Sequence, residues 1–335
     1  MNIAVVGAGA WGTALAINLA ARHKVTLWAR NPALVEAMQA RRTNDRYLPG
    51  CRFPEALHPA ADLQHALTGC DYLIVAVTVA GFRATLRMIR ERNHKVPLIW
   101  LCKGFERPDA RLPHEVFAGE MGAAAGAVLS GPSFAQEVAA GLPTALTLAA
   151  ADNALAVAAA QVLHGPALRV YSHGDVVGVE VGGAVKNVIA IAAGICDGLG
   201  LGLNARAALM TRGLAEITRF GIALGGRAET FMGLAGVGDL LLTCTGDLSR
   251  NRRIGLALAR GEDAAAAQAG LGHVAEGVFT AGEVRRRARD LGIDMPITDA
   301  VCRVLEQPGH AADVVRELLA RDAKPEHMTS SPAGR

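Results

Sequence analysis

The sequence predicts an α/β domain with a mostly parallel, doubly wound sheet, followed by an all-α domain. Two observations support this fold class. Up to about residue 171, short strand-like runs alternate with helical segments, the order that is typical of a parallel sheet with helices on both faces. Beyond residue 171 the strand-like runs stop, and Ala-, Leu- and Ile-rich segments with helical spacing continue. With 335 residues, 51% of them hydrophobic, the chain is long enough for two cores.

Each element is predicted from a local pattern. β-branched and apolar runs predict strands at 3–6, 25–29, 72–77, 98–101, 127–130, 144–148 and 168–171. Helices are expected between most of them, at 13–21, 32–41, 80–92, 112–121 and 152–164. The second domain should contain helices at 174–199, 203–224, 250–260, 275–290 and 297–320. We therefore expect domains at 1–175 and 176–321, with a disordered tail over 322–335.

The first strand leads directly into a glycine motif, Gly7-x-Gly9-x-x-Gly12, which a helical segment follows. Gly7 permits a tight turn, Gly9 lets the backbone approach phosphates, and Gly12 lets the helix close on the strand. Backbone N–H groups at the helix start then face the negative charge. A glycine-rich turn without a ligand is the alternative. Because the motif has both flanking elements, the sequence predicts a Rossmann-type site for a dinucleotide.

The end of the second strand bears on which nicotinamide cofactor binds there. NAD-selective sites carry an acid about 20 residues past the glycines, which binds the ribose 2′-hydroxyl. This chain has Arg30 in that region, and an arginine can pair with a 2′-phosphate. We expect the protein to accept NADP(H) in preference to NAD(H). Alternatively, Arg30 simply precedes the helix that starts at Asn31-Pro32.

Two further strand ends carry polar residues. Lys103 follows the strand 98–101, and Ser130-Gly131-Pro-Ser133-Phe-Ala135 follows the strand 127–130. In open α/β sheets, ligands bind beyond the carboxyl ends of the strands, so both segments are well placed. A helix is expected to start at Ser133, whose side chain is either near the cofactor or only an N-cap.

Lys186 stands in the apolar segment Glu180-Val-Gly-Gly-Ala-Val-Lys186-Asn187-Val-Ile-Ala. A lysine in such surroundings loses water unless a partner compensates it, and burial brings its pKa toward the range that is useful for proton transfer. The alternative is a side chain that extends along the apolar surface to place its amine in solvent.

Two later segments carry further charges. Gly236-Val-Gly238-Asp239 places one acid in an apolar run, where it could pair with Lys186, hold a substrate hydroxyl or cap a short helix. Ser249-Arg250-Asn251-Arg-Arg opens a helix, and its N–H groups with an arginine would suit a phosphate. A basic surface turn is the alternative reading of that segment.

Composition excludes several other classes of protein. The net charge of +3 is too small to argue for nucleic acid, and Arg285-Arg286-Arg287 with Arg289 is read as a solvated helix face. The six cysteines have neither CxxC spacing nor clustered histidines, so we expect no metal site, no disulfide framework and a reducing compartment. The longest apolar stretch, 176–203, contains Glu180, Lys186 and Asp197, so we expect no membrane span. Because Met1 leads directly into a strand, we expect no targeting segment and a cytoplasmic protein.

Taken together, the motifs resemble one family, the bacterial-type NAD(P)-dependent glycerol-3-phosphate dehydrogenases. The resemblance extends from the first strand to about residue 300 and implies a C-terminal domain like that of 6-phosphogluconate dehydrogenase. The motifs that carry it are Gly7-Ala-Gly-Ala-Trp11-Gly-Thr-Ala-Leu-Ala, Lys103-Gly104, Ser130-Gly-Pro-Ser-Phe-Ala135, Glu180-Val-Gly-Gly-Ala-Val-Lys-Asn187, Gly236-Val-Gly-Asp239-Leu, Ser249-Arg-Asn251 and Val274-Ala-Glu276-Gly.

The resemblance implies roles for individual residues. Lys186 would be the catalytic acid and base. The implied substrate contacts are Lys103, Gly131, Ser133, Lys186, Asp239, Ser249, Arg250 and Asn251. The implied cofactor contacts are Gly7, Gly9, Ala10, Trp11, Gly12, Arg30, Lys103, Ala135, Arg250, Val274 and Glu276. Two departures are visible: many members carry Ser at the position of Ala10, and Ser or Thr at that of Cys102.

The implied reaction is the reversible reduction of dihydroxyacetone phosphate to sn-glycerol 3-phosphate by NAD(P)H, for glycerophospholipid synthesis in a homodimer. Protonated Lys186 would donate to the C2 oxygen, Asp239 would orient it, and Arg250 would anchor the phosphate. One alternative keeps the architecture but takes a 3-hydroxyacid or 6-phosphogluconate as substrate. Another is a non-catalytic NADP(H) sensor, which would not need a buried lysine beside a phosphate site.

Overall fold

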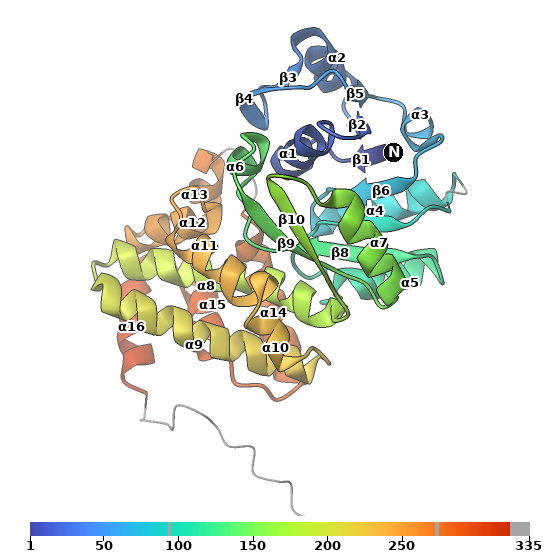
Figure 1. Ribbon diagram of the computed structural model, residues 1–335. Helices are drawn as coiled ribbons and strands as arrows, with labels where there is room; N and C mark the ends of the chain where they lie inside the picture. The colour runs from blue at the N-terminus through green and yellow to red at the C-terminus, as the bar shows by residue number, and fades with distance from the viewer. Residues whose placement is uncertain (93–94, 272–274, 322–335) are drawn as a thin grey trace, which may run out of the picture.

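The computed structural model describes residues 1–92, 95–271 and 275–321. Its N-terminal half contains an eight-stranded sheet in the order β10-β9-β8-β7-β6-β1-β2-β5 (Figure 1). From β5 to β8 all neighbours run parallel, β9 is antiparallel to β8, and β10 is parallel to β9. The prediction of a mostly parallel sheet is confirmed. The strands are β1 (Asn2–Val6), β2 (Lys24–Trp28), β5 (Leu57–Ala60), β6 (Tyr72–Val75), β7 (Leu98–Trp100), β8 (Gly126–Ser130), β9 (Thr144–Ala149) and β10 (Leu168–His173).

Helices cover both faces of this sheet. Because side chains alternate across a strand, Ile3 and Val5 of β1 face one layer of helices while Ala4 and Val6 face the other. The sheet is therefore doubly wound, as predicted. The first layer holds α1 (Ala10–Leu19), α2 (Pro32–Arg41), α6 (Ala135–Ala139) and α7 (Asn153–Leu163), and the second α3 (Leu63–Leu67), α4 (Val79–Arg90) and α5 (Pro113–Met121).

The C-terminal half is helical, as predicted, and has a separate hydrophobic core. Its central element is α8 (Val176–Gly198), which Figure 1 shows running beside α9 (Gly202–Ala223). The remaining elements are α10 (Ala228–Phe231), the π-helical turn η1 (Leu234–Gly238), α11 (Asp239–Thr245), α12 (Arg250–Ala259), α13 (Ala264–Leu271), α14 (Glu276–Asp290), α15 (Pro296–Glu306) and α16 (Ala311–Leu319).

Glycines let α8 and α12 cross with their backbones in contact. A Cβ added to Gly194 would collide with the carbonyl oxygen of Arg252, and one added to Gly255 with that of Ile191. By length and mean hydropathy (1.6) α8 could cross a membrane, but 89% of its most apolar window is buried inside the protein. It is therefore a buried core helix of the C-terminal half.

Several elements differ from the prediction. The predicted helix 297–320 is wrong: α15 and α16 are separated at Pro308-Gly309, where Gly309 adopts a φ of 88° and proline cannot continue a helix. The edge strand β5 was not predicted, because it contains Pro59, which a sheet tolerates at its edge. A two-stranded ribbon, β3 (Thr43–Asn44) with β4 (Leu48–Arg52), was also missed.

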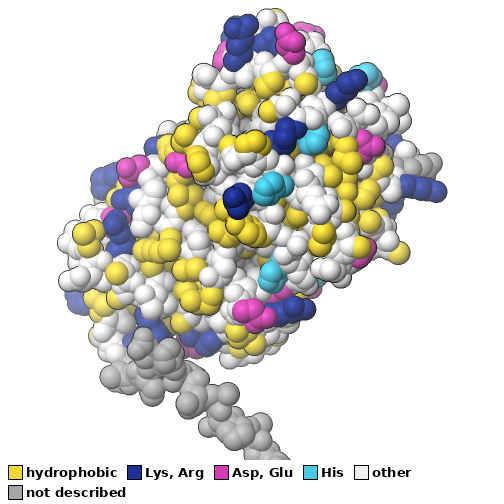
Figure 2. All heavy atoms as spheres, viewed as in Figure 1, with side chains coloured by type: hydrophobic (Ala, Val, Ile, Leu, Met, Phe, Trp, Pro, Cys, Tyr) yellow, Lys and Arg dark blue, Asp and Glu magenta, His cyan; other side chains and the backbone are white. Residues whose placement is uncertain are grey.

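The charged surface agrees with the small net charge. On the face shown in Figure 2, basic, acidic and apolar side chains are interspersed, and neither charge forms a continuous band there. The arginine-rich segment of α14 pairs with carboxylates: Arg285 with Glu306, Arg286 with Glu283 and Arg287 with Glu115. The predicted tail, 322–335, lies outside the described residues.

Candidate active site

The turn after β1 has the geometry that a dinucleotide requires. Gly7 has a φ of 117°, and a Cβ on Gly12 would collide with the carbonyl oxygen of Gly7. Gly9 caps α1, and a Cβ there would have no heavy atom of the described residues within 4 Å. The first-turn N–H groups of a helix have no intrahelical acceptor, so they are available to an anion. This arrangement fits the pyrophosphate of NAD(P).

Asn44 on β3 hydrogen-bonds to the same turn and to α1, a role that the sequence analysis did not predict. Its side chain is fully buried. Nδ2 donates to the carbonyl oxygen of Ala8 at 2.9 Å and to Thr13 Oγ1 at 2.8 Å, while Oδ1 accepts from Tyr47 N at 3.3 Å. The β3–β4 ribbon thus holds the glycine turn in place. No local pattern announces this role, because a lone asparagine far from the glycines has no characteristic spacing.

Two lysines share one carboxylate at the junction of the two domains. Lys186 of α8 donates from Nζ to Asp239 Oδ1, and Lys103 beyond β7 donates from Nζ to Asp239 Oδ2 at 2.7 Å. Lys103 Nζ also lies 3.3 Å from the carbonyl oxygen of Gly131. Asp239 is the first residue of α11 and is 1% exposed. The pairing of Lys186 with Asp239 that the sequence suggested is present, and Lys103 joins it.

Lys186 is buried and does not extend its amine into solvent. Nζ also donates to Thr243 Oγ1 at 2.9 Å, and that hydroxyl donates in turn to the carbonyl oxygen of Asp239. Burial lowers the pKa of Lys186 to about 8; the carboxylate of Asp239 opposes this shift, and the charge of Lys103 adds to it. Sequence reasoning missed Thr243, although its position four residues after Asp239 places both on one helix face.

Further predicted residues surround this cluster. Burial raises the pKa of Glu276, the first residue of α14. The positive charges of Arg250, Lys103 and Lys186 oppose that shift, so Glu276 lies within electrostatic range of all three. Asn251 links the helix starts, because its Oδ1 accepts from Gly277 N at 3.0 Å.

Two of the predicted serines make hydrogen bonds within their own segments, and one predicted helix start is wrong. Ser249 is buried and caps α12, accepting from Arg252 N at 3.2 Å. Ser133 does not start a helix: α6 begins at Ala135 with Phe134 as its cap. Ser133 Oγ instead donates to the carbonyl oxygen of Gly131 at 3.0 Å.

The other predicted residues that the structure describes lie around the carboxyl edge of the sheet or beyond it. Ser130 Oγ, at the end of β8, is buried and has no hydrogen-bond partner among the described residues. Ala135 begins α6, which packs against α1, where Ala10 and Trp11 form the first turn. Arg30 is exposed at the end of β2. Val274 lies outside the described residues.

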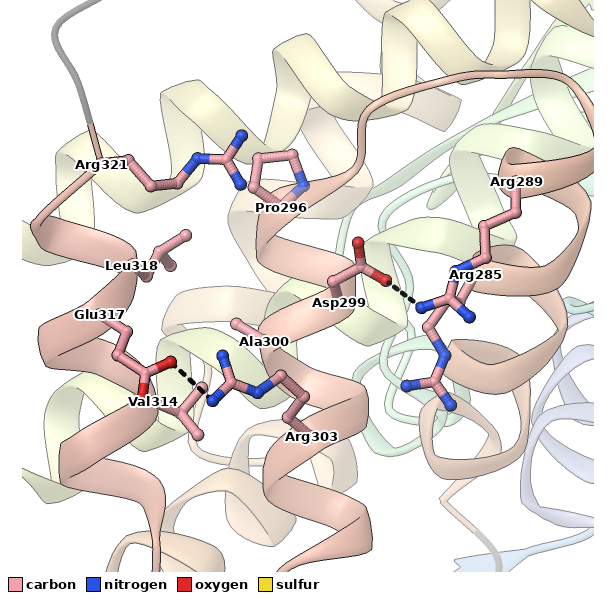
Figure 3. A pocket seen from close by; sticks show the side chains of 10 residues that line it. All are labelled: Arg285, Arg289, Pro296, Asp299, Ala300, Arg303, Val314, Glu317, Leu318 and Arg321. Carbon is pink, nitrogen blue, oxygen red and sulfur yellow. Dashed lines mark ion pairs between the residues drawn. The ribbon is translucent and has the colours of Figure 1, made fainter.

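A separate hollow in the helical domain does not belong to this site. It has a volume of about 340 Å³ and lies among α14, α15 and α16 (Figure 3). Its arginines face carboxylates: Arg303 Nη2 lies 2.6 Å from Glu317 Oε2, and Arg289 Nη2 lies 3.6 Å from Asp299 Oδ1. It shares no residue with the lysine–aspartate cluster.

Among the described residues there is no group of His, Cys, Asp and Glu that could hold a metal ion.

Comparison with known proteins identifies the family. The family model for the N-terminus of NAD-dependent glycerol-3-phosphate dehydrogenase matches residues 2–156, and that for its C-terminus matches residues 175–316. The chain belongs to the family of NAD(P)⁺-dependent glycerol-3-phosphate dehydrogenases. The predicted family is therefore confirmed, and with it the predicted oxidoreductase class and NAD(P) as cosubstrate.

Proteins of this family are similar to the chain over nearly its whole length. The glycerol-3-phosphate dehydrogenase [NAD(P)⁺] of Dechloromonas aromatica is 55% identical over 328 residues, covering 97% of this chain and 99% of that protein. That of Thiobacillus denitrificans is 56% identical over 327 residues, covering 97% and 100%. The crystal structure of glycerol-3-phosphate dehydrogenase from Coxiella burnetii superimposes with a TM-score of 0.91 at 45% identity, covering 96% of this chain and 99% of that one.

Proposed function

We propose that the chain interconverts dihydroxyacetone phosphate and sn-glycerol 3-phosphate with NADP(H) or NAD(H). The observation that carries this proposal is that buried Lys186 and partly buried Lys103 share the buried carboxylate of Asp239. Lys103 follows β7, and the glycine turn follows β1; both strands run parallel within one sheet with β6 between them. Their carboxyl ends therefore meet at one edge, where ligands of such sheets bind.

The two lysines would carry the proton chemistry. When bound, the nicotinamide supplies the hydride to C2 of the ketone or takes it up in the reverse direction. Protonated Lys186 donates its proton to the C2 oxygen, becomes a neutral amine, and is reprotonated from solvent. The charge of Lys103 stabilises the developing alkoxide, and Asp239 holds both amines in position. A pKa of about 8 for Lys186 suits a group that must both give and take a proton near neutral pH.

The helix α12 would bind the substrate phosphate. Arg250 is its first residue, and the adjacent N–H groups point out of the helix start. Asn251 ties the start of α14 to this region, because its Oδ1 accepts from Gly277 N. We assign substrate contacts to Lys103, Gly131, Ser133, Lys186, Asp239, Ser249, Arg250 and Asn251, and cofactor contacts to Gly7, Gly9, Ala10, Trp11, Gly12, Arg30, Lys103, Ala135, Arg250 and Glu276.

We also propose a domain boundary near residue 175, because β10 ends at His173 and α8 begins at Val176. We further propose that the protein is cytoplasmic and serves glycerophospholipid synthesis. Its cysteines are free and nearly all buried, in keeping with a reducing compartment. The expected homodimer stays a prediction.

A single assay separates the proposed function from its alternatives. The purified protein is mixed with NADPH or NADH, and absorbance at the reduced nicotinamide band is followed on adding dihydroxyacetone phosphate. We expect rapid oxidation with that substrate and far less with dihydroxyacetone or 3-oxo acids, and no reduction of NADP⁺ with 6-phosphogluconate. Turnover with an oxo acid alone would favour the other dehydrogenases. Binding of NADPH without turnover of any ketone would favour the sensor.

The phosphate assignment is tested with Arg250→Ala. At saturating NADPH we expect kcat/KM for dihydroxyacetone phosphate to fall by roughly 10²-fold and that for dihydroxyacetone to fall much less, because only the first has a phosphate to lose. Arg253→Ala is the matched control, since that arginine is exposed on the same helix and donates to the carbonyl oxygen of Asp247. Equal losses on both ketones would contradict the assignment.

The cofactor preference is tested with Arg30→Asp. An acid at the end of β2 repels a 2′-phosphate and accepts a ribose hydroxyl, so the ratio of KM for NADPH to KM for NADH should rise. The same substitution at Arg41, which is exposed on α2, should leave that ratio unchanged. An unchanged ratio in Arg30→Asp would remove Arg30 from the cofactor site.

A further inference from the structure

Outside the lysine–aspartate cluster, another buried carboxylate joins the two domains. Glu180 of α8 is 3% exposed and accepts three hydrogen bonds. Oε1 accepts from Trp100 Nε1 at 2.7 Å and from the backbone N of His114 at 2.9 Å, and Oε2 lies 2.6 Å from His114 Nδ1. Trp100 ends β7, while His114 stands in the first turn of α5. One side chain of the helical domain therefore holds two elements of the sheet domain.

The position of this contact along the chain connects it to both lysines. Lys103 stands three residues after Trp100, and Lys186 stands six residues after Glu180. Between them α8 approaches the sheet closely: a Cβ on Gly183 would lie 2.8 Å from Ser130 Oγ and 3.5 Å from Lys103 Cδ. The segments that carry the two amines are thus joined at Glu180 and again at Asp239.

The surroundings leave this contact little freedom. The indole of Trp100 packs against Phe82 and Phe117, with ring centroids 6.1 and 5.0 Å away. The Glu180 carboxylate lies at the start of α5, where a helix favours negative charge. A rigid, fully hydrogen-bonded contact of this kind can fix the separation of groups beyond it, because packed interiors do not deform continuously.

We propose that Glu180 is a positioning residue that sets the distance between Lys186 and Lys103 through its bonds to Trp100 and His114. The inference rests on the proposed function of the two lysines. Loss of the carboxylate would let α8 shift relative to β7. Because misplacement of a catalytic group by about 1 Å can cost on the order of 10²-fold in rate, the effect should appear in kcat. Cofactor binding at the glycine turn after β1 should not change.

The test compares Glu180→Ala with Glu216→Ala in the full-length protein. Glu216 is a matched control: it is also a buried carboxylate, and among the described residues the hydrogen bonds that it accepts come from Ile297 and Thr298 at the start of α15, not from α8 or β7. Both variants should lose thermal stability. Glu180→Ala should lower kcat for dihydroxyacetone phosphate by about tenfold or more and move the upper limb of the kcat–pH profile, with the Kd for NADPH within twofold. Glu216→Ala should keep both kcat and that pH limb.

Two milder variants decide the question should Glu180→Ala fail to fold. Glu180→Gln retains an oxygen for Trp100 and His114 N, so kcat should stay within about threefold of wild type. Trp100→Phe removes one donor while keeping a ring against Phe82 and Phe117. It should lower kcat while changing the melting temperature of the protein only slightly. Wild-type kcat in Trp100→Phe, or equal kcat losses in Glu180→Ala and Glu216→Ala, would overturn the proposal. A wild-type protein without ketone reductase activity would instead overturn the proposed function.

Discussion

The glycine turn and the lysine–aspartate cluster are built in opposite ways. The turn is made of adjacent residues, and its function depends on side chains that are missing: no Cβ at Gly7, Gly9 or Gly12. The cluster consists of charged side chains from three distant segments, which meet only after the two domains have packed together. A ligand of the turn is bound by backbone amides, whereas a ligand of the cluster meets two amines.

This difference determines which changes each region tolerates. In the turn, added atoms should be damaging. A methyl group that meets protein atoms should lower stability, and one that meets the ligand should weaken cofactor binding. In the cluster, removed atoms should be damaging, and chemistry should be lost without loss of the cofactor.

The largest effect is expected for Lys186→Ala. Loss of the proton donor and of its charge should lower kcat by about 10³-fold or more, because general acid catalysis and alkoxide stabilisation disappear together. The Kd for NADPH, measured by fluorescence titration, should stay within about threefold. Lys24→Ala, which changes an exposed lysine at the start of β2, should behave as wild type. Retained turnover in Lys186→Ala would falsify the catalytic assignment.

The next prediction separates two glycines of one turn. Gly12→Ala would force its Cβ into the carbonyl of Gly7, so the free energy of unfolding should fall by about 2 kcal/mol. Gly9→Ala meets no described atom within 4 Å, so thermal stability should be preserved. Its methyl group would instead occupy the approach of the pyrophosphate and raise KM for NADPH by roughly tenfold. Thermal denaturation and cofactor kinetics of both variants check this, and a stable Gly9→Ala with normal KM would contradict it.

A third prediction concerns the support of the turn by Asn44. Asn44→Ala leaves the Ala8 carbonyl and the Thr13 hydroxyl without their buried donor, which should cost about 1–3 kcal/mol of unfolding free energy. KM for NADPH should rise with little change in kcat. Chemical denaturation of Asn44→Ala, Thr13→Val and the double variant measures the coupling between the two side chains. Strict additivity would show that the two side chains do not act as a pair.

The smallest effect is expected from pH. Reduction of the ketone needs protonated Lys186, and burial lowers the pKa of this lysine in the ligand-free protein to about 8, so kcat/KM for reduction should fall as pH rises through about 8. Oxidation of glycerol 3-phosphate needs the neutral amine and should rise over the same range. Steady-state kinetics in both directions between pH 6 and 9.5 measures this. If the rates of reduction and oxidation both rose, or both fell, over this pH range, the assignment of one group as acid and base would be contradicted.

The same contrast explains how far the sequence could be interpreted. The glycine turn was predictable because its requirements are local and fall at fixed spacing, and the pairing of Lys186 with Asp239 could be suggested because both charges stand in apolar runs. Asn44 and the Trp100–Glu180 contact were not predictable, since each depends on a partner that only tertiary packing brings near. Thr243 had a local signal, its position four residues after Asp239 on one helix face, but its bond to Lys186 depends on tertiary packing. The break at Pro308-Gly309 could have been inferred from those two residues, whereas the edge strand β5 was hidden by Pro59.

The composition of α8 has a consequence for how the chain is made. This helix supplies both Glu180 and Lys186, yet it is apolar enough to resemble a membrane-spanning segment. During synthesis it leaves the ribosome before α9, α12 and α14, which cover it in the folded protein, have been made. Exposed apolar surface of this kind promotes aggregation of nascent chains. The helix that carries the proposed catalytic lysine therefore depends on helices translated after it, and truncation within the last third of the chain should reduce soluble yield.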